Sequence, residues 1–455
     1  MTTAKPPSSF RTPQRPQVFY WHYAWVIVSI IAVMQMVGSS VRMAFGVFID
    51  PLSTEFGWSQ GAITMAYALS SVVTAVASPM AGSLGDRIGA RKAMMIGCTL
   101  FIVGVMLTGV INQVWQLYVT FGLMLGVAQA IFLVPLIPSA MTWFRRHLGL
   151  GMGILMAAWG LGPALATPLL GYMIEAFGWK DTFWITAVVS AFIMAGLIAV
   201  YKNKPSDHGV DPYGFVRGDP DIGSKRPPAE RVKQFTGYMR RTAAYWNLSS
   251  IHFLGCVGHA IILIYIIPIA VNEGISLVVA ASLVTAMSAV SIITRLATPV
   301  MCDKYGPKMV MTVAYLIQGL TVIMLFWTHD VWLFFAFAAA FGIGYGGEAG
   351  GFPILNRRYY GFAPVGSAHG FQMLGAGLGM ALGGWIGGVI FDMMGNYDWA
   401  LIISVVASVA GAVSILLLEP TNRLLIPDWE KEPVAEDESQ SAEGQVRVPT
   451  SAGAD

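Results

Sequence analysis

Charged residues are scarce in this chain. Only 11% of the 455 residues are Asp, Glu, Lys or Arg, whereas 55% are hydrophobic, and an average soluble domain carries about 25% charged residues. The net charge is only +2, and no run of basic residues is interleaved with aromatics as in single-strand binders. The composition therefore excludes an ordinary water-soluble fold and nucleic acid as a partner.

Cysteines are equally few. Cys98, Cys256 and Cys302 lie in or at the ends of apolar segments and lack the spacing of metal ligands. We interpret them as buried, inert thiols, and we expect neither a metal site nor a cofactor. No nucleophile-base pair, His-rich cluster or soluble catalytic domain is visible, so the protein is not predicted to be an enzyme.

Long apolar runs are what the sequence has in abundance. Runs of about 20 residues are long enough to cross about 30 Å of hydrocarbon as a helix. Hydropathy predicts an all-α membrane protein of twelve transmembrane helices. The predicted spans are 24–49, 60–84, 92–111, 114–142, 149–177, 181–201, 245–272, 277–301, 309–328, 331–356, 367–394 and 397–418.

Polar segments divide the chain into two halves. Residues 202–244 contain five prolines and nine basic residues, a composition typical of a linker. The polar segment 1–20 and the acidic segment 420–455 are predicted to be disordered, and the first apolar run is too long for a signal peptide. The predicted organisation is a six-helix bundle over 21–201, a linker, and a second bundle over 245–419.

The basic residues predict the orientation, because Lys and Arg are retained on the cytoplasmic side of short loops. With both termini cytoplasmic, 24 of the 27 Lys and Arg residues fall on the inner side. Lys180 alone lies in an outer loop, and Arg42 and Arg295 lie within spans. We expect a multi-pass protein of the inner (plasma) membrane, embedded in the bilayer as a monomer.

The two halves share a repeat. Asp86 and Asp303, in equivalent loops, are 217 residues apart. The same offset relates Gly89 to Gly306, Gly171 to Gly388, Glu175 to Asp392 and Gly178 to Gly395. Parallel repeats of this kind place a binding site at the bilayer midplane between the halves, with alternating access as one half rocks against the other.

The repeated loops carry a recognisable motif. The first, G-S-L-G-D-R-I-G-A-R-K, resembles the signature of the major facilitator superfamily through Asp86, Arg87, Gly89, Arg91 and Lys92. The second, P-V-M-C-D-K-Y-G-P-K, carries Asp303, Lys304 and Lys308. Charge-assisted bonds of these residues either open and close as a gate or form a static clamp at the cytoplasmic face.

Three further stretches resemble one branch of that superfamily, the oxalate:formate antiporters and monocarboxylate porters. They begin at Ala44 (A-F-G-V-F-I-D-P-L-S-T-E-F-G-W-S), at Trp143 (W-F-R-R-H-L-G-L-G-M-G-I) and at Gly342 (G-I-G-Y-G-G). The resemblance implies secondary transport of small carboxylates, often with protons, and no ATP hydrolysis.

Four ionisable residues lie deep in the predicted spans: Arg42, His259, Arg295 and Glu348. A charge at the centre of a span costs about 2.5–3.5 kcal/mol, so each should face a cavity or a partner. A rise of about 1.5 Å per residue places Arg42 and Arg295 roughly 12 Å from the ends of their helices. We expect all four to meet near the midplane.

The arginines are the predicted anion-binding groups. A guanidinium matches a carboxylate in geometry and stays charged. The resemblance also implies that Arg295 coincides with an arginine that carboxylate-transporting relatives carry in the span equivalent to 277–301. An ion pair with Glu348 is the alternative for Arg295, and snorkelling toward the surface for Arg42. Trp159 and Gln372 are further candidates for the substrate site.

Glu348 is the first candidate for carrying a coupling proton, and His259 the second. With both arginines charged and Glu348 ionised, the site is +1 and suits a monoanion such as lactate or pyruvate. Ser291 stands where monocarboxylate relatives often carry an acid, which departs from their arginine–aspartate coupling. A dicarboxylate exchanger and a proton-driven exporter of amphipathic compounds remain alternatives, the latter because G-L-G-P at Gly160 resembles an exporter motif.

Overall fold

The computed structural model describes residues 21–216, 229–361, 363 and 365–429. The segment 1–20 and most of the tail, 430–455, for which disorder was predicted, lie outside these residues, as does part of the linker. Within the described residues the regular structure is helical apart from one isolated parallel bridge, between Phe144 and Tyr213.

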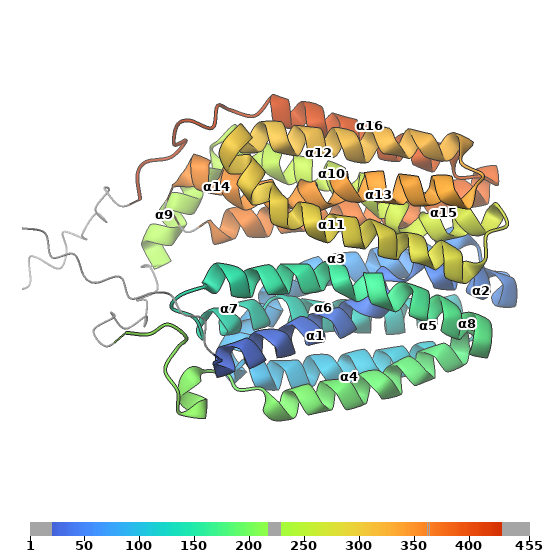
Figure 1. Ribbon diagram of the computed structural model, residues 1–455, viewed down its shortest axis with the longest axis horizontal. Helices are drawn as coiled ribbons and strands as arrows, with labels where there is room; N and C mark the ends of the chain where they lie inside the picture. Colours follow the sequence, from blue (N-terminus) through green and yellow to red (C-terminus); the bar gives the residue numbers. More distant parts are fainter. Residues whose placement is uncertain (1–20, 217–228, 362, 364, 430–455) are drawn as a thin grey trace, which may run out of the picture.

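The first half forms a bundle of helices that run back and forth along one axis (Figure 1). Its elements are α1 (Tyr23–Met43), α2 (Gly46–Phe56), α3 (Gln60–Ile88), α4 (Ala90–Thr108), α5 (Val114–Leu117), the π-helix η1 (Tyr118–Met124), α6 (Leu125–Leu133), α7 (Leu136–Met141) and α8 (Leu148–Val200). The 3-10 turn η2 (Pro205–His208) and α9 (Ala229–Arg240) follow in the linker.

The second half repeats this arrangement above the first in Figure 1. Its elements are α10 (Ala243–Asn272), α11 (Leu277–Tyr305), α12 (Pro307–Val322), the 3-10 turn η3 (Ile323–Trp327), α13 (Val331–Glu348), the 3-10 turn η4 (Ala349–Gly351), α14 (Phe352–Tyr360), α15 (Gly366–Met394) and α16 (Asp398–Leu416). We call the end of the bundles that carries α9 the linker end, and the opposite end the far end.

Eleven helical segments of the described chain are long and apolar enough to cross a membrane. The longest lies within α8, whose 53 residues would span roughly 80 Å as one straight helix, far more than a bilayer core. Gly178 interrupts it with a non-helical φ of 80° and ψ of 165°, and the chain reverses there (Figure 1). The twelve predicted crossings are therefore confirmed.

The halves are joined at the far end. The main cross-bundle packing is α3 against α15 and α8 against α11. Among the described residues, five hydrogen bonds cross between the bundles, and all lie between the far end and the middle of the helices. Closer to the linker end, a Cβ added to Gly153 of α8 or Gly370 of α15 would meet no atom within 4 Å.

Carboxylates cap helices across this contact. Asp392, near the end of α15, accepts the backbone N–H groups of Gln60 (2.8 Å) and Gly61 (2.7 Å), which begin α3. Glu175 in α8 accepts the N–H of Val278 at the start of α11 (3.3 Å). A carboxylate satisfies the free N–H groups and the positive dipole of a helix N-terminus. The two caps are equivalent under the 217-residue repeat.

The linker packs in two parts. Before residue 217 it follows the first bundle, where the N–H of Tyr213 donates to the carbonyl of Trp143 (2.8 Å). Helix α9 instead packs on the second bundle, with Arg231 4.2 Å from the ring centroid of Trp429. The described linker residues thus divide between the two halves on either side of 217–228.

Candidate functional site

Arg295 lies near the middle of α11, facing α13. The side chain is partly buried, and its guanidinium carbon is 4.9 Å from the ring centroid of Tyr345. Its Nε is buried and has no hydrogen-bond partner. The helices pack tightly here, since a Cβ on Gly346 would lie 1.8 Å from Thr294 Oγ1. Arg295 is therefore held by an aromatic face, which stabilises its charge without neutralising it.

Arg42 lies in the other half, near the end of α1. It is only 5% exposed. Its Nη2 donates to Ser71 Oγ (2.8 Å), and the guanidinium carbon is 5.1 Å from the ring centroid of Tyr67. The Nε of Arg42 and the hydroxyl of Tyr67 are buried without hydrogen-bond partners. Arg42 is thus directed at α3 and does not snorkel toward the surface.

Tyr67, the ring beside Arg42, lies at the interface between the halves. Tyr67 packs against α15, where a Cβ on Gly384 would lie 2.4 Å from its ring. Each arginine thus lies against a tyrosine of its own half, and neither has an acid within salt-bridge distance among the residues that the structure describes.

Buried donors without a hydrogen-bond partner accompany both arginines. A buried donor without a partner costs about 1–3 kcal/mol. Three such donors lie here: Nε of Arg42, Nε of Arg295 and the hydroxyl of Tyr67. A carboxylate supplies the acceptors that these groups lack, and its charge offsets that of one guanidinium.

Glu348 and His259 form a buried pair within the second half. Oε2 of Glu348 is 2.9 Å from Nδ1 of His259, and the residues are 2% and 7% exposed. Oε1 lies 3.4 Å from the hydroxyl of Tyr315. Gly255 makes room for the carboxylate, because a Cβ there would be 2.3 Å from Oε1. The alternative ion pair between Glu348 and Arg295 is not found among the described residues.

The remaining predicted substrate residues differ in their surroundings. Trp159 is partly exposed in α8, beside Gly160, where a Cβ would approach Ile292 of α11 to 2.9 Å. Gln372 in α15 is fully buried, and its amide exchanges two hydrogen bonds with that of Asn356 (2.9 and 3.0 Å). Gly160 therefore lies at the contact between the halves, next to Trp159 in the chain, whereas Gln372 is held inside the second half.

The motif loops fasten helices within each half. Arg91 donates from Nε to the carbonyl of Ile198 (3.0 Å), and Lys308 donates to the carbonyl of Leu418 (2.6 Å). Each thus caps the end of the last helix of its own bundle, a favourable place for a cation. Gly89 turns the chain between α3 and α4 with φ 86°. These contacts favour the static clamp over the gate for Arg91 and Lys308.

The other motif residues show no such contacts. Arg87, Lys92, Asp303 and Lys304 are exposed. None of these four forms an ion pair with another residue that the structure describes. The side chain of Asp86 lies outside the described part.

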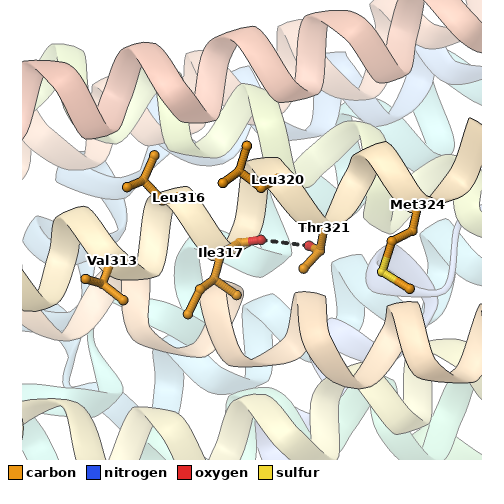
Figure 2. Close-up of a pocket in the computed structure, with 6 residues that line it drawn as sticks. All are labelled: Val313, Leu316, Ile317, Leu320, Thr321 and Met324. Carbon is orange, nitrogen blue, oxygen red and sulfur yellow. Dashed lines mark hydrogen bonds between the residues drawn. The ribbon is translucent and has the colours of Figure 1, made fainter.

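A pocket on α12 and η3 is a different kind of surface. Figure 2 shows its lining residues, which are Val313, Leu316, Ile317, Leu320, Thr321 and Met324. The hydroxyl of Thr321 donates to the carbonyl of Ile317 (2.8 Å). With no charge and no free donor among these six residues, the groove is suited to lipid chains and not to an anion.

Comparison with known proteins agrees with this architecture. The sequence profile described as Major Facilitator Superfamily matches residues 28–299 and 248–450. The chain belongs to this superfamily. Its members are membrane transporters and not enzymes.

The curated relatives of this major facilitator protein include carboxylate transporters. The oxalate:formate antiporter of Oxalobacter formigenes is 25% identical over 405 residues, which cover 88% of this chain and 92% of that protein. The human monocarboxylate transporter 2 is 22% identical over 435 residues, covering 92% and 90%. The predicted branch is thus confirmed at the level of similarity.

A solved structure shows the same fold. It is the crystal structure of a bacterial homolog to the human lysosomal transporter Spinster, in an inward-facing and unoccupied conformation. The TM-score is 0.68 at 14% identity, over 88% of this chain and 96% of that one. At this identity the likeness establishes the fold alone.

The sequence reasoning did not select several residues that complete the site. Tyr67, Ser71 and Tyr345 contact the arginines, but polar aromatic and hydroxyl residues are common in spans and gave no signal. His252 and Cys256 lie on the same face of α10 as His259, at spacings of seven and three residues. That spacing was visible, yet Cys256 was interpreted only as an inert thiol.

Proposed function

We propose that this transporter carries small organic carboxylates by alternating access, with a monocarboxylate such as lactate or pyruvate as substrate. The observation that carries the proposal is the pair of arginines, Arg42 and Arg295, without acidic partners and with buried, unpaired donors. They belong to opposite halves, Arg42 to α1 and Arg295 to α11, and we propose that a single anion between the halves is held by both.

The charge balance favours a monoanion. Two guanidinium groups and one ionised Glu348 leave the site at +1, which one carboxylate neutralises. Trp159, next to Gly160 at the α8–α11 contact, is the aromatic side chain that we propose for a wall of the substrate site. We do not assign Gln372 a direct contact in this state, because Asn356 occupies its amide.

We further propose that protons are coupled through the Glu348–His259 pair. The two groups share one hydrogen bond in a buried place, so the pair can hold a proton between a carboxylate and an imidazole. Arg295 lies on α11, which packs against the α13 helix of Glu348, so its charge would act on this pair through space. Binding an anion at Arg295 offsets that charge and favours proton uptake by the pair.

The arrangement of the halves supports an inward-facing state. Placing the basic loops in the cytoplasm makes the linker end the cytoplasmic end, and the far end the closed outer side. We propose a monomer in the inner (plasma) membrane with both termini cytoplasmic. Rocking of the halves would then expose the arginines to either side in turn.

Uptake into proteoliposomes tests this function. Radiolabelled lactate or pyruvate should accumulate under an inward proton gradient. Arg295→Ala should lower uptake about 10- to 100-fold, because a hydrogen bond to a charged group contributes about 1.5–3 kcal/mol. Arg295→Lys should retain part of it, and Arg241→Ala, an exposed arginine of the linker, should retain all of it. Uptake that survives both Arg295 changes would exclude this residue as the anion anchor.

Two alternatives have distinct results in the same assay. A proton-driven exporter would extrude amphipathic compounds and take up no carboxylate. A dicarboxylate exchanger would need internal oxalate or a similar acid for uptake and would be indifferent to the proton gradient. Either result would replace the proton-coupled monocarboxylate proposal.

A further inference from the structure

Three potential metal ligands converge inside the second half. His252 and Cys256 of α10 lie four residues apart, hence on one helix face, and Glu348 reaches them from α13. One ligand atom from each lies within 4.8 Å of the other two. The residues are 6%, 3% and 2% exposed, in that order. This is a buried trio of nitrogen, sulfur and oxygen donors.

The trio has a free ligand atom in a place where polar atoms are normally paired. Nδ1 of His252 is buried and has no hydrogen-bond partner, while its ring stacks on Phe352 at 4.3 Å. The thiol of Cys256 is free. A buried, unpaired nitrogen next to a free thiol is unfavourable unless a ligand occupies the position.

The donor set selects the class of metal. Thiolate, imidazole and carboxylate together suit zinc and its heavier analogue cadmium, whereas magnesium and calcium require oxygen ligands. Metal–ligand bonds of about 2.0–2.3 Å place donors at most about 4.6 Å apart, so a small inward shift of the side chains is sufficient. His259 already holds the other oxygen of Glu348 (2.9 Å), the kind of supporting contact that orients a metal ligand.

We propose that His252, Cys256 and Glu348 form an inhibitory binding site for a thiophilic divalent cation of the zinc class. On binding, the Cys256 thiol releases its proton to solvent and the thiolate sulfur bonds to the cation. The carboxylate of Glu348 becomes a ligand and can no longer accept a proton. A bound cation would therefore stop proton-driven uptake; this step rests on the proposed proton coupling through Glu348.

Cadmium binding tests the site independently of transport. Purified full-length protein should bind one Cd²⁺ at the trio, with the ultraviolet charge-transfer band of a cadmium–thiolate bond. Cys256→Ser should abolish the band, and His252→Asn should weaken binding by at least about tenfold. Cys302→Ser provides the matched control, because Cys302 is also a buried free thiol but belongs to α11. Thermal unfolding verifies that each variant is folded.

The outcomes separate this inference from the transport proposal. No band, or a band that survives Cys256→Ser or disappears in Cys302→Ser, would overturn the metal site. A band without any carboxylate uptake would leave the site standing and reject the transport function. Where uptake is present, Zn²⁺ should inhibit wild-type protein at least about tenfold more strongly than His252→Asn. Equal inhibition of the two would reject the inhibitory role.

Discussion

The far-end cap made by Asp392 should hold the outer side closed, and Asp392→Asn should release it. The carboxylate accepts hydrogen bonds from two backbone N–H groups at the start of α3 (2.8 and 2.7 Å). These two bonds join α15 of the second half to α3 of the first half. An asparagine has one acceptor oxygen and no charge, so one of the two bonds is lost and the other weakened.

The magnitude follows from these two bonds. A hydrogen bond to a charged group contributes about 1.5–3 kcal/mol, and a neutral one about 0.5–1.5 kcal/mol. Asp392 is exposed to solvent, so we take the low end, a net loss of about 1.5 kcal/mol. This shifts the equilibrium between the two states about tenfold toward the state open at the far end.

Distances between spin labels measure this shift. Asn112 and Trp332 are exposed residues at the far end, one in each half. With labelled cysteines at both positions, pulsed electron resonance should report a larger population of the longer distance in Asp392→Asn. Asp398→Asn, a nearby acid at the start of α16, is the control. If the two variants give the same distribution as the parent, the cap does not hold the far end closed.

Two further predictions concern single side chains. Gly255→Ala should displace Glu348, whose Oε1 would lie 2.3 Å from the new methyl, and reduce proton-driven uptake at least about tenfold. Gly237→Ala, which meets nothing within 4 Å, should leave uptake unchanged. Hydrogen bonds from Lys180 and from the indole of Trp179 hold the pKa of Glu55 below its usual value of 4.5. This stabilisation is present above that pH and lost as pH falls through the lowered pKa, so Glu55→Gln should flatten the acid side of a Tm-versus-pH curve. If Glu55→Gln gave the same Tm-versus-pH curve as the parent protein, the hydrogen bonds of Glu55 would not contribute to stability.

Most of the fold could be predicted because lipid leaves few alternatives. Every backbone group in the hydrocarbon must be paired within its own helix, so apolar length alone gives the crossings. The differences lie where the helix is interrupted. The predicted span 114–142 contains a π-helical segment and a break before α7, near Pro135, which cannot donate a backbone hydrogen bond. The predicted span 331–356 contains a 3-10 turn in its Gly-rich part.

The sequence predicted how deep the candidate residues lie in the membrane, but not which neighbouring helix each side chain faces. The rise per residue gave the level of Glu348 and His259 along their helices, and the structure brings these two together. Rotation of each helix about its axis is set by packing of the whole bundle, which no single span encodes. For that reason the sequence allowed an ion pair between Glu348 and Arg295. In the structure the carboxylate of Glu348 contacts His259 instead.

The hydrogen bonds of Arg91 and Lys308 connect helices of the same half. The described linker residues likewise pack on one half or the other. In the described part of the chain, these contacts stabilise each bundle without a covalent connection to its neighbour. A chain cut within 217–228 and co-expressed as two polypeptides should reassemble into a working carrier, so that each fragment can be labelled separately for spectroscopy.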